Sequence, residues 1–491
     1  MTSTEDLRLH RTLRFEVLGT KDEKQVALVA PVTTAPARQI QEQAKSRPPS
    51  DKKLSIFLDI NEDYTRQVIA NALRTRNATV TYGPGDGDDA VPLPPDCDFQ
   101  WSEYERIDWS AVLAGKHGAS SYCVRKGISR KAQLAHYTRL HVCKNPDSLL
   151  KDAIPKTVIL DTWPVWEDGD SNAGAGGLDD IMTGAAPKSD GINRKKLLDK
   201  CLQDAKQVMD EAEQTYQDDC KTNPKADAPV WILKPSTVNK GVGIEIVHLY
   251  EQLVDICWTE SDIREWVLQR YIDPPLLLGK RKFHIRAYVV AVSALRVYFY
   301  RDCLALCCGR RYRRFDTSNK FAHLTNTAYQ DKDLDFNEEN CVRLWSDDDA
   351  AEILVKDGTC PTLEDARKRV KEVVDQMERI TGELFRAYTN EFGVFAPIEG
   401  CFEQYGFDFM VGKDWKVSLL EVNPGPDFKQ TGSRLSRVIE NLMCDTIDAA
   451  LLGDCVDAES GETNVGKLAL VYIDEKRSKK NGKGGINMRL T

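Results

Sequence analysis

Two apolar segments near the end of the chain constrain the fold more than any other feature. Residues 406–411 and 415–422 are rich in aromatic and branched side chains and flank a short Gly-Lys-Asp turn at 412–414. Apolar runs separated by a turn sequence that contains glycine are typical of a β-hairpin. We therefore predict two antiparallel strands that pair at the edge or centre of a sheet.

The predicted hairpin carries three polar residues within its apolar runs, namely Asp408, Glu421 and Asn423. Residues two apart on a strand share a face, so Glu421 and Asn423 point the same way, and Asp408 lies roughly opposite Glu421. Buried carboxylates need a partner or a metal, and magnesium prefers oxygen ligands. This patch predicts a magnesium site; the alternative is a pair of solvated strand carboxylates.

A second pattern places a lysine directly after a short apolar strand, Trp231-Ile232-Leu233. Lys234 can meet a phosphate as a point charge, and the glycines of the following loop let backbone N–H groups approach phosphate oxygens. The loop contains Lys240, Gly241 and Gly243 but is not a Walker A sequence. A plain turn explains the two glycines equally well.

A third pattern is the alternating segment that starts at Lys282. Lys282, His284 and Arg286 fall on one strand face, with apolar residues on the other. Adjacent basic groups repel one another unless an anion lies among them, which favours a phosphate or carboxylate ligand; a solvated sheet face is the alternative. Just before it, residues 269–272 end a strand, and their exposed backbone groups suit an adenine edge.

The order of apolar, polar and glycine-rich segments along the chain predicts a mixed α/β (α+β) protein of several units. We expect an extension at 1–53, a small α/β domain at 54–120, a central lobe at 121–272 and a C-terminal lobe at 273–465. A Gly, Asp, Ala and Ser stretch at 165–193 is a predicted insertion in the central lobe. Residues 466–491 form a strand-like end and a basic tail, and 80–95 is a predicted loop.

Composition narrows the class of protein. The chain has 491 residues, a net charge of −9 and 41% hydrophobic residues, and it has no long apolar run or secretory signal. We expect a cytoplasmic protein with no membrane or nucleic-acid partner. The 14 cysteines show no CxxC spacing, which favours reduced thiols. Basic runs at 280–282 and 310–314 leave room for an acidic partner.

Taken in order, these segments resemble the tubulin–tyrosine ligase family. The resemblance rests on WILKPSTVNKGVGIEIV, WVLQRYIDPPLLLGKRKFHIRAYVV, YFYRD, HLTNTAYQ and FEQYGFDFMVGKDWKVSLLEVNPGP, with YCVRKGISRKAQL earlier in the chain. It covers roughly residues 121–452, apart from the insertion. The resemblance implies an ATP-grasp fold, in which two lobes clamp ATP, and it implies ATP and Mg²⁺ as cofactors.

The resemblance also implies roles for individual residues. Arg286, Lys234 and Glu421 would be catalytic, with Arg286 facing the acceptor or the amino-acid carboxylate. Magnesium would be held by Asp408, Glu421 and Asn423. The nucleotide would be bound by Lys131, Lys234, Lys240, Gly241, Gly243, Gln269, Arg270, Tyr271, Ile272, Lys282, His284, Thr325 and Asn326.

Two positions depart from the family pattern. His284 stands where the family commonly has an aspartate that contacts the nucleotide sugar, and Leu306 stands where it has a substrate-site arginine. Arg310 would take the place of that arginine only if this chain were aligned with the family pattern after a shift of a few residues. The metal and phosphate groups are retained, so the sequence supports ATP binding more strongly than tyrosine specificity.

The expected function is ATP-dependent addition of an amino acid, tyrosine first, to the C-terminal carboxylate of α-tubulin through an acyl phosphate. One alternative is a tubulin glutamylase- or glycylase-type ligase. Another is a ligase-like binding module of the P-body-associated type, in which a hydrolase-like half is fused to the ligase-like half. We expect no room for such a half before Leu54. This expectation, together with the retained Asp408, Glu421 and Asn423, disfavours the binding module.

Overall fold

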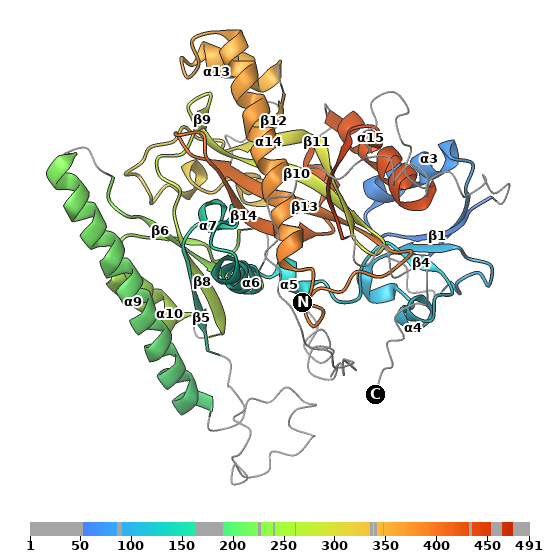
Figure 1. The fold of residues 1–491 in the computed structure, drawn as a ribbon, viewed down its shortest axis with the longest axis horizontal. Coiled ribbons are helices and arrows are strands. Elements are labelled where there is room, and N and C mark those ends of the chain that lie inside the picture. Colours follow the sequence, from blue (N-terminus) through green and yellow to red (C-terminus); the bar gives the residue numbers. More distant parts are fainter. Residues whose placement is uncertain are drawn as a thin grey trace, which may run out of the picture.

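The computed structural model describes residues 53–85, 91–162, 190–223, 227–238, 241–260, 262–333, 337, 341–346, 348–431, 435–452 and 464–474. The described residues form three β-sheets with helices packed on them (Figure 1). The predicted extension at 1–53, apart from its last residue, most of the insertion at 165–193, and the basic tail lie outside this part of the chain. None of the described helices is long and apolar enough to cross a membrane.

The first sheet is small and parallel, with the strand order β2-β1-β3-β4. Its elements are β1 (Ser55–Asp59), α3 (Asp63–Thr75), β2 (Thr79–Tyr82), β3 (Phe99–Ser102), α4 (Trp109–Leu113) and β4 (Gly118–Ala119). Helix α3 begins where the Glu62 carboxylate accepts hydrogen bonds from the N–H groups of Tyr64 and Thr65. The predicted loop from residue 80 was wrong for Val80 to Tyr82, because these residues pair in parallel with β1.

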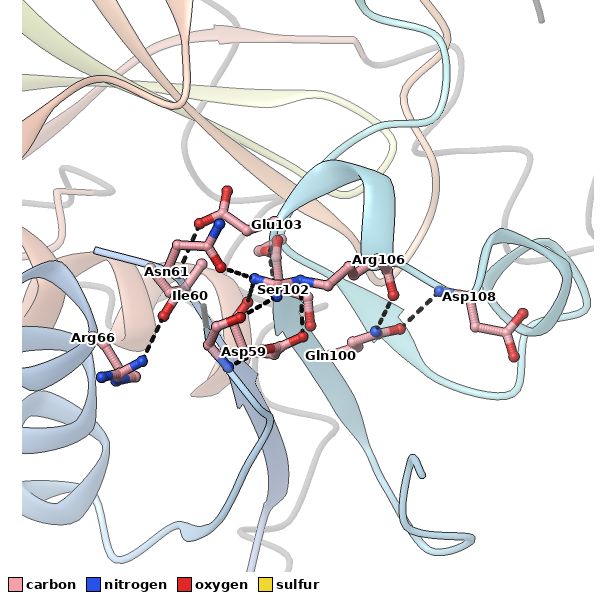
Figure 2. Close-up of polar contacts among 11 residues, drawn as sticks. Asp59, Ile60, Asn61, Arg66, Gln100, Ser102, Glu103, Arg106 and Asp108 are labelled. Carbon is pink, nitrogen blue, oxygen red and sulfur yellow. Dashed lines mark hydrogen bonds and ion pairs between the residues drawn. The ribbon is translucent and has the colours of Figure 1, made fainter. Parts of the chain in front are cut away.

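A polar network closes the carboxyl edge of this sheet (Figure 2). Asp59 is 3% exposed; its carboxylate accepts a hydrogen bond from the Gly85 N–H at 3.0 Å and pairs with Arg106 Nε at 3.0 Å. Arg106 also donates to the Gly85 carbonyl and to Asn61, and the Asn61 N–H donates to Glu103. This edge of a parallel sheet is a common ligand crevice. Here its polar groups bind one another, so the network has a structural role.

Replacing Arg106 by leucine should lower the free energy of unfolding by ~1–3 kcal/mol, because the buried Asp59 carboxylate loses its cation. Urea denaturation of the purified protein measures this change. Arg74→Leu is the matched control, since Arg74 lies on the exposed side of α3, where its guanidinium donates to Asn71 and Tyr82. Equal stability of the two variants would contradict the role given to the network.

The second sheet is antiparallel, in the order β5-β8-β6-β7. Its strands are β5 (Thr157–Asp161), β6 (Trp231–Pro235), β7 (Glu245–Val247) and β8 (Glu265–Arg270). The long helix α9 (Asp190–Thr222) and α10 (Tyr250–Thr259) cover one face, and α9 forms the outer edge of the molecule in Figure 1. Leu198, Leu202 and Ala205 of α9 pack with Trp231 and Leu268 of the sheet.

The third sheet is the largest, with seven strands and the path β12-β11-β10-β13-β14. Its strands are β9 (Leu277–Leu278), β10 (Arg281–Val292), β11 (Arg296–Cys307), β12 (Val342–Trp345), β13 (Phe402–Val411), β14 (Val417–Pro424) and β15 (Leu468–Ile473). The predicted hairpin is therefore present, although its second strand begins at Val417 rather than Trp415. Strand β15 comes from the predicted C-terminal end and pairs with β11.

Both faces of the large sheet are covered. Helices α14 (Leu363–Ala387), α6 (Lys131–Lys144) and α7 (Leu150–Ala153) pack on the face that carries Phe283, Ile285 and Ala287. Helices α3 and α15 (Ser436–Ile447) pack on the other face (Figure 1). The described residues also form the short helices α5 (Lys126–Ser129), α11 (Thr327–Gln330) and α13 (Asp349–Lys356). All described cysteines are free thiols.

Candidate active site between two sheets

The first half of β10 turns three basic side chains toward the second sheet. Lys282, His284 and Arg286 are 3%, 3% and 7% exposed, which rules out a solvated sheet face. Farther along the same face the strand becomes apolar, with Tyr288 and Val290 in the core beneath α15. One strand thus contributes both to the core and to a polar site because its side chains alternate.

Arg286 is held by Asp408 of the neighbouring strand. The two residues are opposite each other in the β10–β13 register, and the guanidinium contacts both carboxylate oxygens at 2.5 and 3.0 Å. Burial alone would lower the pKa of Arg286, but the charge of Asp408 outweighs burial and raises it. The anion expected beside Arg286 is, in this structure, the Asp408 carboxylate.

The three candidate metal ligands converge as the hairpin predicted. The register pairs Asp408 with Glu421, and the Asn423 amide nitrogen donates to an Asp408 oxygen at 3.3 Å and to a Glu421 oxygen at 3.4 Å. A half-turn of the amide would present its oxygen to a cation at the same place. Two carboxylates and an amide oxygen suit a hard cation such as Mg²⁺. Among the described residues there is no cluster of three His, Cys, Asp or Glu residues that would hold a metal, so the amide is needed to complete this set.

Lys131 contacts this carboxylate patch from helix α6. Its ammonium lies 3.3 Å from a Glu421 oxygen and 3.1 Å from the Val238 carbonyl, which belongs to the loop after β6. Burial alone would raise the pKa of Glu421, but the charges of Lys131 and Lys234 outweigh burial and hold it below its usual value. Glu421 is therefore an anion ready for a cation at neutral pH.

Lys234 lies on β6 at the centre of the second sheet. Its ammonium donates to the Gln269 side chain at 2.8 Å, and Gln269 donates to Thr157 at 3.1 Å. Burial lowers the pKa of Lys234 to about 8. Lys131, Lys234 and Gln269 line one small cavity together with Leu419 and Leu420 of β14, so both sheets contribute to it.

The Lys282 ammonium is supported by side chains from the linker between the sheets. It donates to the Tyr271 hydroxyl at 2.6 Å, and that hydroxyl also contacts His323 Nδ1 at 2.9 Å. Burial lowers the pKa of Lys282 to about 7, against 10.5 for an ordinary lysine. Sequence reasoning missed the part played by His323; its only signal was its place in the HLTN segment.

The lowered pKa of Lys282 predicts a pH-dependent affinity for nucleotide. Below pH about 7 the free protein already carries the ammonium that attracts phosphate; above it, binding must take up a proton. Affinity for MgATP should therefore fall between pH 7 and 9, by at most about tenfold per pH unit for one proton.

Calorimetry in buffers of different ionisation heat measures this proton uptake. At pH 8.5 the Lys282→Arg variant should take up fewer protons than the wild type when MgATP binds, since arginine keeps its charge. The control is Lys116→Arg, at an exposed lysine of the first sheet's domain, which should behave as wild type. An unchanged uptake in Lys282→Arg would contradict the assignment.

The two departures from the family pattern are cross-strand partners. His284 and Leu306 pair in the β10–β11 register, and Leu306 is buried at 2% exposure. His284 Nδ1 lies 2.7 Å from the Thr325 hydroxyl, and burial lowers the pKa of His284, which keeps the ring neutral. Arg310 does not take the place of the missing arginine, because Asp333 binds its guanidinium at 2.7 and 2.8 Å.

The loop after β6 contains two glycines with left-handed backbone. Gly241 and Gly243 have φ angles of 73° and 71°, a region that favours glycine. A side chain on Gly241 would begin 3.1 Å from the Asn326 amide oxygen, so this loop lies against the Thr325–Asn326 segment. Lys240 lies outside the described residues.

A larger cavity of about 660 Å³ lies beside the linker between the sheets. Arg270, Tyr271 and Ile272 line it on one side, and residues 412–414 and 416 of the hairpin turn line it on the other. Strand β8 ends at Arg270, so Tyr271 and Ile272 belong to the linker itself. This size is within the range of small-molecule sites.

Comparison with solved structures identifies the fold class. The chain superposes on the C-terminal domain of Pby1 from K. lactis, described as an ATP-grasp enzyme interacting with the mRNA decapping enzyme Dcp2. The TM-score is 0.51 at 27% identity, covering 80% of this chain and 92% of that domain. The fold is an ATP-grasp fold, as the sequence predicted.

The profile of the tubulin-tyrosine ligase family matches residues 174–459, and the chain belongs to this family. A probable tubulin–tyrosine ligase of Schizosaccharomyces pombe is 27% identical over 435 residues, which cover 82% of this chain and 92% of the relative. The probable tubulin–tyrosine ligase PBY1 of Saccharomyces cerevisiae is 27% identical over 71% of this chain but only 45% of its own length. Tubulin glycylase 3B of Tetrahymena thermophila is 24% identical over 60% of this chain and 24% of the relative.

Proposed function

We propose that this chain is an ATP-dependent carboxylate–amine ligase that adds an amino acid, tyrosine first among the candidates, to the C-terminal carboxylate of α-tubulin. One observation carries the proposal: three cationic side chains lie beside the Asp408–Glu421–Asn423 set, between two sheets. These side chains are Lys131, Lys234 and Arg286. Phosphoryl transfer needs such a set of fixed charges.

The proposed reaction has two steps. The acceptor carboxylate attacks the γ-phosphorus of ATP, which forms an acyl phosphate and releases ADP. The α-amine of the free amino acid then attacks the acyl carbon, so that a peptide bond forms and phosphate leaves with the bonding electron pair. The amine loses one proton in this step, and the net products are the ligated protein, ADP and phosphate.

The side chains divide this work. Lys131 and Lys234 would neutralise phosphate oxygens, while the Gly241–Gly243 backbone would cover them and the linker residues 270–272 would hold the adenine. Arg286 would orient Asp408 and hold the acceptor carboxylate. Asp408, Glu421 and Asn423 would hold Mg²⁺, which, when bound, neutralises charge on the transferring phosphoryl group.

The test is to incubate the purified protein with ATP, magnesium and detyrosinated tubulin, with tyrosine, glutamate or glycine supplied separately. The mass of α-tubulin should rise by one tyrosine residue, with one ADP formed for each addition. A gain with glutamate or glycine alone would replace the tyrosine assignment. ATP binding without any gain would contradict ligation of these amino acids to tubulin.

A second candidate is a ligase-like module that binds a partner of the mRNA decapping machinery. The likeness to the Pby1 domain, whose description includes an interaction with Dcp2, favours it. The paired His284 and Leu306 departures also support a change of substrate. Retention of the full Asp408–Glu421–Asn423 set favours the catalytic proposal over a module that only binds.

A further inference from the structure

A chain of three hydrogen bonds starts at the Lys282 ammonium and leads away from the candidate active site. The ammonium donates to the Tyr271 hydroxyl at 2.6 Å, and that hydroxyl contacts His323 Nδ1 at 2.9 Å. The chain ends where His323 Nε2 contacts the Arg313 carbonyl at 3.1 Å, in the loop after β11. The side chains of Lys282, Tyr271 and His323 are all buried, so water does not compete for the first two bonds.

The two ends of the chain fix the direction of every hydrogen bond in it. An ammonium can only donate, so the Tyr271 oxygen accepts from Lys282. A carbonyl can only accept, so His323 Nε2 carries a proton and donates to Arg313. Burial and the charge of Lys282 lower the pKa of His323, so its ring is neutral and Nδ1 is left to accept the Tyr271 proton. All the donors therefore point from Lys282 toward the loop.

The loop after β11 holds His323 and the linker together. The Tyr312 and His323 rings lie 5.0 Å apart, and the Tyr312 hydroxyl donates to Asp273 at 3.1 Å. Arg314 donates to the other Asp273 oxygen at 2.6 Å. Asp273 lies in the linker two residues after Tyr271. The loop is thus attached to both sides of the Tyr271–His323 contact, which keeps that contact in place.

The titratable groups that face the chain come from several elements. They are Lys234 of β6, His284 of β10, Cys308 directly after β11, Asp273 of the linker, and Tyr312 and Asp316 of the loop. Burial lowers the pKa of Lys282 to about 7, because the nearby Cys308 and Asp273 do not outweigh it. The ammonium and amine forms of Lys282 are therefore close in free energy at neutral pH, where a single hydrogen bond changes their ratio.

We propose that His323 is a positioning residue of the ligase site, which acts through the Tyr271 hydroxyl to keep Lys282 as an ammonium ready for a nucleotide phosphate. While His323 accepts the Tyr271 proton, the hydroxyl offers Lys282 only an oxygen lone pair, which favours the ammonium. Without that acceptor the hydroxyl is free to turn and donate to the neutral amine, which favours the uncharged form. The inference rests on the proposed function, because it takes Lys282 to bind a phosphate of ATP.

Two substitutions of nearly equal size separate the acceptor from the bulk of the side chain. In His323→Asn the side-chain oxygen can take the place of Nδ1 and accept from Tyr271, whereas His323→Leu offers no acceptor. Neither variant keeps the ring, so a difference between them reports on the bond to Tyr271. Carbon-13 NMR of protein labelled at the lysine Cε atoms follows the titration of Lys282, whose signal is assigned by its absence from Lys282→Arg.

The titration midpoint of Lys282 should fall by about one pH unit in His323→Leu, because one hydrogen bond to a charged group corresponds to about one pKa unit. In His323→Asn the shift should be less than about half as large. Since the ammonium binds phosphate, His323→Leu should bind MgATP about twofold more weakly than wild type at pH 6 and about tenfold more weakly at pH 8.5. Calorimetry at the two pH values measures these ratios.

Tyr271→Phe provides a second, independent variant. It keeps the aromatic ring, whose centre lies 3.8 Å from the Lys282 ammonium, but removes the hydroxyl that links Lys282 to His323. The Lys282 midpoint should fall in this variant as well. Adding His323→Leu to Tyr271→Phe should lower it no further, because the chain is already broken at its centre.

An unchanged midpoint in His323→Leu, or equal shifts with leucine and asparagine, would overturn the proposal. A loss of MgATP affinity that is the same at pH 6 and pH 8.5 would also overturn it, because a purely structural defect has no such pH dependence. A midpoint that shifts as expected in a protein that binds no MgATP would contradict the proposed function, while still supporting the effect of His323 on Lys282.

Discussion

Replacing Glu421 by glutamine is expected to slow amino-acid ligation by about a hundred- to thousandfold at saturating ATP. The amide has the shape of the carboxylate but lacks the charge that Lys131 contacts at 3.3 Å and that a magnesium ion requires. Loss of the charge should also raise the magnesium concentration needed for half-maximal turnover. Initial rates of amino-acid incorporation over a magnesium titration measure both effects.

Glu440→Gln serves as the control for this variant, since Glu440 lies on the exposed side of α15. It should ligate at the wild-type rate with the wild-type magnesium dependence. Should Glu421→Gln behave in the same way as this control, Glu421 is not a metal ligand and the assignment of the site fails.

Replacing Arg286 by methionine is expected to cost about 3–5 kcal/mol of unfolding free energy, because it leaves the Asp408 carboxylate buried without its cation. Asp408 is 3% exposed, so water cannot substitute for the guanidinium. Ligation should be lost as well, since Asp408 would no longer be held in place. Chemical denaturation followed by circular dichroism gives the stability, and the incorporation assay gives the activity.

A second substitution separates the two effects. Adding Asp408→Asn to Arg286→Met removes the uncompensated charge, so the double variant should be more stable than Arg286→Met yet still inactive. Arg301→Met is the control, since Arg301 pairs with Glu378 at the surface and its loss should cost less than about 1 kcal/mol. An Arg286→Met variant as stable as this control would show that the buried pair contributes little.

The hairpin half of the site could be predicted from the sequence. The two strands are adjacent in the chain, so the turn fixes their register as far as Phe409 and Leu419. A register shift between Asp408 and Phe409 then brings Asp408 opposite Glu421, and nothing in the sequence indicated this shift. The apolar residues around them indicated burial. The same local reasoning gave the alternating face of β10.

Contacts between distant segments could not be predicted in this way. Arg286 meets Asp408 across 122 residues, and nothing local sets the register of β10 against β13. Lys131 approaches Glu421 from a helix, so strand periodicity carries no signal for it. The run at 310–314 looked uniformly basic, yet its arginines divide into bound and exposed ones only because Asp273 and Asp333 lie beneath the loop.

The most direct test of the central claim follows the oxygen atoms of the acceptor. Tubulin with oxygen-18 in its terminal carboxylate is incubated with ATP, magnesium and the amino acid that supports ligation, and the released phosphate is analysed by mass spectrometry. An acyl phosphate predicts one oxygen-18 atom in each phosphate released with ADP. Unlabelled phosphate, or AMP formed in place of ADP, would contradict phosphoryl transfer to the acceptor at this site.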